Sequence, residues 1–367
     1  MHYKIQILIF YVYALVQIIE TINMKHNLKI ILLLVSFFFL SQIIGLGILT
    51  QYIDMKTTSE TGKTTLFNAT YDITGITPPS IENESYSFIG IVIAVIIGTV
   101  LVLLIIKYKR KTLWQMWFFL SVILTLIMAF SPFVMKLLNY VKYLNSFVSY
   151  GFIITLILAG VLAYLKVFRK EIITHNFTEL FIYGGLASLL VPVLNLISGL
   201  ALLIVISIYD MYAVWHSKHM ISMAEFQTDN KIFAGLMIPY NKNKIETDEE
   251  IKKTDDKART GKITKSAKAS KSIAGEEKEN LIESSGSTEP RNAILGGGDI
   301  AFPLLFSGAI MKYTGTFTAP IIISVCAAIA LFLIYRFGKK DKYYPAMPFI
   351  TLGCLIGAGV VWLLFGL

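Results

Sequence analysis

The chain has few charged residues and almost no cysteine for its length. Charged side chains make up 16% of its 367 residues, and the two cysteines, Cys326 and Cys354, both lie within apolar segments. Two isolated cysteines give neither a disulfide framework nor a cluster with the spacing of metal ligands. The sequence also lacks the HExxH pattern of zinc proteases and the GxSG pattern around a nucleophilic serine. We therefore predict no metal site and no cofactor.

Apolar residues, in contrast, are abundant throughout the sequence. They account for 55% of the chain, and the mean hydropathy is +0.65, which indicates a membrane protein. A helix needs about 20 apolar residues to span a bilayer. Nine segments meet this requirement, at about 28–50, 86–106, 113–135, 147–165, 177–194, 196–215, 292–311, 318–337 and 345–366. The predicted fold class is an all-α polytopic membrane protein with nine transmembrane helices.

The amino-terminal residues contain a further apolar run, at 3–20. Met24, however, begins a stretch with a charged start followed by apolar residues, which is typical of a natural amino terminus. Residues 1–23 are therefore interpreted as an extension, which is either a mis-assigned start or an extra apolar segment.

The rest of the chain divides into three parts. Residues 24–215 hold the first six predicted helices, residues 216–291 form a long loop, and residues 292–367 hold the last three helices. Within the loop, residues 241–290 are rich in Lys, Glu, Ser, Thr and Gly with almost no aromatics, which predicts a disordered linker. Residues 231–240, KIFAGLMIPY, are too short to span and are expected to form a strand or an interfacial segment.

The basic residues are distributed unequally between the two sets of loops. With nine spans after Met24, 27 of the 33 Lys and Arg fall on the side of Met24 and only five on the other side. By the positive-inside rule, the Met24 end is cytoplasmic and the carboxyl terminus lies outside a cell membrane. The net charge of +9 is thus explained by topology, and no nucleic-acid partner is expected.

Two acidic residues lie at membrane depth. Asp210 is about six residues from the end of the sixth predicted span, and Asp299 is about eight residues after Arg291. At about 1.5 Å per residue, both lie roughly 9 to 12 Å from the same face. An ionisable group at such depth costs at least ~2.5 kcal/mol and marks a functional site by default. The chain is therefore expected to bring the two carboxylates together.

A pair of carboxylates suits hydrolysis of a peptide bond by water. Two neighbouring acids share one proton and titrate as a unit, so one acts as general base on water while the other donates to the scissile carbonyl. Three glycines, Gly296, Gly297 and Gly298, precede Asp299. They allow close backbone approach and a locally unwound helix start, although they are also consistent with simple helix packing at the end of a loop.

Three short motifs resemble those of a known family. The residues IYD at 208–210, the GxGD pattern formed by Gly296, Gly298 and Asp299, and PAMP at 345–348 are similar to the three signatures of the presenilin and signal peptide peptidase family. That family consists of intramembrane aspartyl proteases of the GxGD type. The motifs fall on the sixth, seventh and ninth predicted helices in the family's order, so the resemblance covers essentially the whole chain from Met24.

The resemblance implies a presenilin-like fold and a role for each motif. Asp210 and Asp299 would be the catalytic pair, and Pro345, Ala346 and Met347 would match the family's PAL motif, which lies beside the active site and helps to receive substrate. The sequence departs from that motif at Met347, where leucine is usual. This exchange conserves volume and hydrophobicity, so it is expected to affect substrate preference more than activity.

Tyr209 precedes the first acid, as in the family, and is open to two interpretations. It is either a hydrogen-bonding residue of the site or an ordinary packed aromatic.

The resemblance also implies partners. The expected substrates are transmembrane proteins or peptides with their amino ends outside, in contact with membrane lipids, and the compact chain is similar to the archaeal members, which need no companion subunits. The sequence leaves open whether the protein forms a homo-oligomer. Two alternatives remain: a prepilin or preflagellin peptidase, which is also of the GxGD type, and a channel or transporter that uses the acids as a proton relay.

Overall fold

The computed structural model describes most of the predicted membrane segments. The described residues are 28–67, 70–71, 74–79, 84–108, 110–140, 150–169, 171–216, 223, 226–227, 232–240, 291–338 and 344–365. The predicted extension at 1–23, the predicted start at Met24 and the predicted linker at 241–290 all lie outside these residues.

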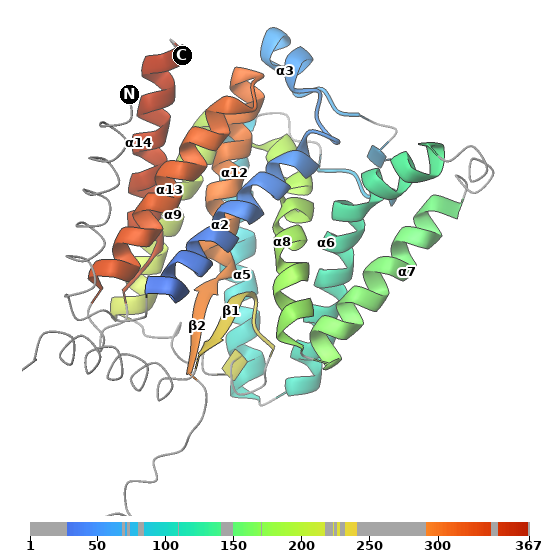
Figure 1. Cartoon of the computed structure of the whole chain (residues 1–367), viewed down its shortest axis with the longest axis vertical. Coiled ribbons are helices and arrows are strands. Elements are labelled where there is room, and N and C mark those ends of the chain that lie inside the picture. The colour runs from blue at the N-terminus through green and yellow to red at the C-terminus, as the bar shows by residue number, and fades with distance from the viewer. Residues whose placement is uncertain are drawn as a thin grey trace, which may run out of the picture. The chain divides into compact units, whose positions relative to one another are not determined.

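The described part of the chain is dominated by long helices (Figure 1). They are α2 (Leu28–Leu49), α5 (Ser87–Lys107), α6 (Lys111–Tyr140), α7 (Gly151–Tyr164), α8 (Ile172–Leu190), α9 (Leu196–Met211), α12 (Gly297–Thr314), α13 (Thr318–Phe337) and α14 (Met347–Phe365). One unit comprises Met1–Leu236 and Leu295–Leu367 and holds all of these helices, while Met237–Ile294 form a second unit.

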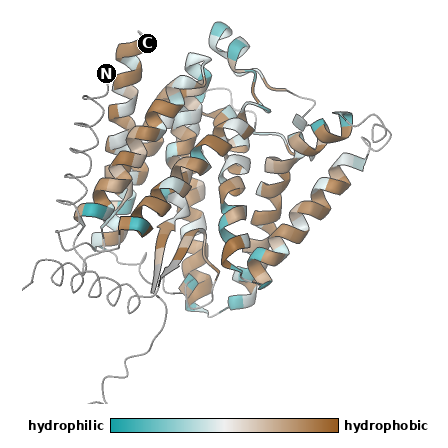
Figure 2. Ribbon diagram, in the orientation of Figure 1, coloured by the Kyte–Doolittle hydropathy of each residue, from teal (hydrophilic) through white to brown (hydrophobic). Residues whose placement is uncertain are grey.

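The helices have the apolar surface that a bilayer requires. Figure 2 shows apolar residues along most of their length, with hydrophilic residues gathered near the ends. Among the described residues, eight helices are long and apolar enough to cross a membrane, and α12 is the long helix that does not meet this composition. The all-α polytopic class is therefore confirmed, while the count of nine spans stays a prediction.

One predicted boundary is wrong, and the glycines explain the error. The span expected at 292–311 begins as a strand, β2 (Arg291–Gly296), and the helix starts only at Gly297. Gly296 has the extended backbone of a helix N-cap, with φ −63° and ψ 143°. Glycine favours such a boundary because it loses more conformational freedom in a helix than other residues do. The six residues before α12 are thus strand rather than helix.

The strand expected within 231–240 is present. It is β1 (Gly235–Tyr240), and it pairs with β2 in a two-stranded sheet. The N–H of Gly297 donates a hydrogen bond of 3.1 Å to the carbonyl of Ala234, so the pairing continues past the start of β1 and the end of β2. The two strands therefore run in opposite directions.

Helix α12 is packed on several sides. It contacts α2, α8, α9, α13 and α14, and its residues from Ile300 to Lys312 are almost all buried. Close approach depends on small residues, since a Cβ at Gly308 would lie 2.8 Å from Val191 and 2.9 Å from Leu49. The side chain of Gln42 on α2 also donates a 2.9 Å hydrogen bond to the carbonyl of Ile300. Packing on these sides makes α12 a fixed support for Asp299.

A buried lysine near the far end of α12 has a structural role. Lys312 donates hydrogen bonds of 3.2, 2.9 and 2.8 Å to the carbonyls of Val191, Pro192 and Leu194, and it lies 3.3 Å from Glu84. These carbonyls follow the end of α8, where backbone acceptors lack helical partners and a cation is favourable. Lys312 therefore satisfies a helix end and leaves no free charge.

The contact between α6 and α8 gives a testable prediction. A Cβ at Gly185 would overlap the backbone carbonyl of Thr125 and lie 3.2 Å from the nitrogen of Ala129. Because backbone cannot easily move aside, Gly185→Ala should lower the free energy of unfolding by about 1–3 kcal/mol. Gly160→Ala is the matched control, since nothing lies within 4 Å of a Cβ there. Equal melting temperatures for the two variants in one detergent would contradict this packing.

Candidate active site

Asp210 lies in the last α-helical turn of α9. The helix continues directly into a π-helical turn, η5 (Tyr212–His216), and such turns are frequent at functional sites. The carboxylate of Asp210 accepts a 3.1 Å hydrogen bond from the backbone N–H of Met347, the first residue of α14. One turn away, the hydroxyls of Ser207 and Thr351 are 2.6 Å apart. Two contacts therefore fix α9 against α14 at the level of the acid.

Asp299 lies in the first turn of α12. Its carboxylate lies beside the backbone of Gly296, where an added Cβ would be 3.2 Å from Oδ2, and it is close enough to Asp210 for the two charges to interact. A helix N-terminus favours an acidic side chain, because the unpaired N–H groups and the helix dipole are positive there. The depth predicted for Asp299 assumed eight helical residues before it, whereas the structure places two helical residues and a strand there. The two acids nevertheless meet, because α9 and α12 are in contact.

The two carboxylates line one cavity of about 160 Å³. Six of the eight predicted site residues contribute to it, namely Tyr209, Asp210, Gly296, Gly298, Asp299 and Met347. At about 30 Å³ per water molecule, the cavity has room for several waters. It is smaller than the roughly 300–1,000 Å³ of typical ligand sites, so a peptide chain requires an opening of the surrounding helices.

The remaining predicted residues occupy supporting positions. Pro345 and Ala346 precede α14, which begins at Met347 rather than at 345 as predicted, and they do not contribute to the cavity wall. Tyr209 lines the cavity and donates a 3.0 Å hydrogen bond to the hydroxyl of Thr99 on α5. Of the two interpretations of Tyr209, the hydrogen-bonding one agrees with this contact.

The cavity also contains residues that sequence reasoning missed. Thr99 is a hydroxyl residue in the apolar middle of α5, and Phe302 lies one helical turn after Asp299. Both residues could have been found from the sequence, because Thr99 is a polar residue inside a span and Phe302 is three residues after an acid on the same helix. Gly297 does not line the cavity, but the close approach expected there has a specific partner. A Cβ there would lie 2.8 Å from the hydroxyl of Tyr183 on α8, a contact that no local pattern reveals.

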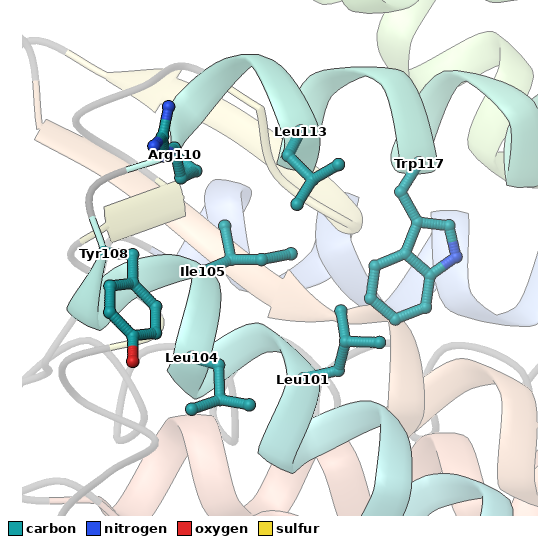
Figure 3. A pocket seen from close by; sticks show the side chains of 7 residues that line it. All are labelled: Leu101, Leu104, Ile105, Tyr108, Arg110, Leu113 and Trp117. Atoms are coloured by element: carbon teal, nitrogen blue, oxygen red, sulfur yellow. The ribbon is translucent and has the colours of Figure 1, made fainter.

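The structure offers little support for other kinds of site within the described residues. No group of three or more His, Cys, Asp and Glu side chains that could hold a metal ion occurs among them. A larger cavity of about 450 Å³ lies between α5 and α6 (Figure 3). Its wall is apolar apart from Tyr108 and Arg110, and it contains no acid. Acid and base chemistry therefore fits the smaller cavity.

The contact between Asp210 and α14 can be tested through the backbone. Met347→Pro removes the N–H that holds the carboxylate, yet proline is well tolerated at the first position of a helix. Because a hydrogen bond to a charged group contributes about 1.5–3 kcal/mol, the variant should unfold more easily by that amount. Met347→Leu keeps the N–H and should melt close to the wild type. Equal melting temperatures for the two variants would show that the N–H contributes nothing.

Comparisons with known proteins identify the family of this chain. Two solved structures, each described as a presenilin family intramembrane aspartate protease, in the C222 and P2 space groups, share 16% sequence identity with this chain. Their TM-scores are 0.49 and 0.45, and the matches cover 90% and 89% of this chain and 99% and 96% of those chains. No curated protein matches the sequence. The model of the family described as signal-peptide peptidase, presenilin aspartyl protease matches residues 66–367, and the chain therefore belongs to that family.

Proposed function

We propose that Asp210 and Asp299 are the catalytic pair with which this intramembrane aspartyl protease hydrolyses peptide bonds within or near transmembrane segments. The observation that carries the proposal is that both acids line one cavity with room for water. Asp210 accepts the N–H of Met347, and the carboxylate of Asp299 lies against the backbone of Gly296. Both acids are thus oriented before substrate arrives, which is the preorganisation that catalysis requires.

The chemistry follows from the shared proton of the pair. The ionised carboxylate removes a proton from a water molecule as the water attacks the scissile carbonyl carbon. The protonated carboxyl donates its proton to the carbonyl oxygen, which gives a tetrahedral diol. As the diol collapses and the C–N bond breaks, the carboxyl that took the proton from water gives it to the leaving nitrogen, and the other carboxylate takes a proton from a diol hydroxyl. The pair then returns to its single-proton state, so the reaction needs no metal and no covalent intermediate.

The three motifs take complementary roles in this proposal. IYD and GxGD supply the acids, while PAMP supplies a backbone donor through Met347. The donor is a backbone N–H group, so the presence of methionine at 347 in place of the family's usual leucine preserves the hydrogen bond to Asp210. The glycine pair Gly296 and Gly298 lines the cavity without side chains, which leaves room for the backbone of a substrate.

The orientation in the membrane follows from charge, and it determines which substrates fit. We infer that the side with 27 of the 33 Lys and Arg is cytoplasmic. With this topology, the resemblance to the family implies substrates with their amino ends outside. In right-side-out vesicles, a membrane-impermeant thiol reagent should label a cysteine at Lys56→Cys and spare one at Lys111→Cys. The reverse pattern would overturn the orientation.

The family assignment favours this function over the two alternatives. A prepilin peptidase would cleave a leader segment beside the membrane, and a transporter would move an ion or solute without cutting any peptide. To test the first alternative, the purified protein is incubated with both a pilin leader and a labelled transmembrane peptide. Cleavage of the leader alone would support a prepilin peptidase. Uptake by proteoliposomes that depends on Asp210, without proteolysis, would support the second.

The catalytic proposal is tested with single substitutions in detergent. Asp210→Ala and Asp299→Ala should each reduce cleavage of a labelled transmembrane peptide by about 10²–10⁴-fold, or to background, because each removes one partner of the acid–base pair. Asp54→Asn is the control. Asp54 caps the short helix α3 (Met55–Thr61), and asparagine caps a helix equally well. Cleavage at the wild-type rate by either alanine variant would contradict the proposal.

A further inference from the structure

A buried ion pair lies at one end of α8, away from the two aspartates in sequence. Lys166 and Glu179 are 2.5 Å apart, and both side chains are at most 2% exposed. Glu179 also accepts a 3.2 Å hydrogen bond from the backbone N–H of Gly235 at the start of β1. The proposed chemistry uses neither residue. A buried pair of this kind is weak support for stability alone, since its desolvation offsets much of its attraction.

A neighbouring histidine holds the same glycine. His175, one turn before Glu179 on α8, has its Nε2 2.8 Å from the carbonyl of Gly235 and its Nδ1 3.3 Å from the ammonium of Lys166. A carbonyl only accepts and an ammonium only donates, so the contacts assign the neutral ring with its proton on Nε2. Both backbone groups of Gly235 are therefore bonded by side chains of α8, which fixes this residue in orientation.

His175 and Glu179 together form a clamp on the backbone of Gly235. The conformation of this residue shows why a glycine is required there. Its φ of 145° is a value that residues with a Cβ rarely adopt, and a Cβ there would overlap the carbonyl of Leu295 and lie 3.1 Å from the nitrogen of Gly297. The start of β1 is thus held in an unusual conformation against the end of β2 and the first residue of α12.

A short series of contacts connects the clamp to Asp299. The carbonyl of Ala234, the residue before Gly235, accepts the N–H of Gly297, and Asp299 follows two residues later. Tyr183, one turn after Glu179, places its hydroxyl against Gly297 from the same face of α8. Three residues spaced by four lie on one face of α8, namely His175, Glu179 and Tyr183. This face lies against the segment that precedes Asp299.

We propose that Glu179, supported by Lys166, is a positioning residue that sets the place of Asp299 relative to Asp210 by holding Gly235 and, through Ala234, the start of α12. The inference rests on the proposed function of the two aspartates. It assigns Glu179 no contact with substrate. Its effect on catalysis passes through the backbone, and a small displacement of a reacting group is sufficient to slow a reaction about a hundredfold.

Two double variants separate positioning from stability. Lys166→Met with Glu179→Gln removes both charges but keeps an oxygen that can accept from Gly235, whereas Lys166→Met with Glu179→Leu removes the acceptor as well. Because neither leaves a lone buried charge, both should fold. The glutamine variant should keep kcat within about fivefold of wild type, while the leucine variant should lose about tenfold to hundredfold in kcat at nearly constant KM.

Lys312→Met is the control for a general loss of stability. Lys312 is a buried cation on α12 with an acidic partner, like Lys166, but its contacts lie at the opposite end of that helix from Asp299. This variant should melt at a lower temperature while kcat per folded molecule stays near the wild-type value. Equal kcat in the two double variants would overturn the positioning role and leave Glu179 as a counter-ion for Lys166.

Hydrogen exchange gives a readout that does not depend on proteolysis. Peptides that cover 232–240 and 295–300 should exchange faster in the leucine variant and at nearly the wild-type rate in the glutamine variant. If exchange in these peptides is faster in the leucine variant, but Asp210→Ala cleaves at the wild-type rate, the proposed catalytic pair is rejected and the clamp is retained. Unchanged exchange in the leucine variant would reject the clamp itself.

Discussion

Each ionisable side chain at membrane depth must have a partner, and this requirement organises the structure. Lys166 is paired with Glu179, Lys312 bonds three carbonyls and lies beside Glu84, and Asp210 receives the N–H of Met347. A charge without such partners would cost several kcal/mol in an apolar interior. The polar contacts therefore fall where helices must be fixed against one another, around α8, α12 and α14.

The same requirement distinguishes structural charges from those proposed to act in catalysis. The pair of Lys166 and Glu179 has opposite signs, and each group has one further contact, from Lys166 to His175 and from Gly235 to Glu179. Asp210 and Asp299 have the same sign, and they line a cavity with room for water. Two like charges at close range resist simultaneous ionisation, so in the proposed mechanism the pair holds a proton that can be transferred. A compensated pair has no such proton to give.

Much of this arrangement could be predicted from the sequence, because long apolar runs and isolated acids are local signals. The positions of the helices and the two aspartates required no more than hydropathy and spacing. The strand before α12 was missed, since the apolar residues 293–295 match a helix as well as a strand in so short a run. The clamp on Gly235 was equally inaccessible, because it joins His175 and Glu179 to a glycine more than fifty residues later.

The replacement of helix by strand before Asp299 has a mechanical consequence. In a continuous helix, Asp299 would be fixed by the hydrogen bonds of the preceding turns. Instead α12 begins two residues before the acid, so its first turn depends on the strand pairing and on the N–H of Gly297. Pro303 removes a further backbone donor, the one that would bond the carbonyl of Asp299. Besides the packing of α12, the position of this acid therefore depends on the strand pairing before it, which is where the proposed contacts of α8 act.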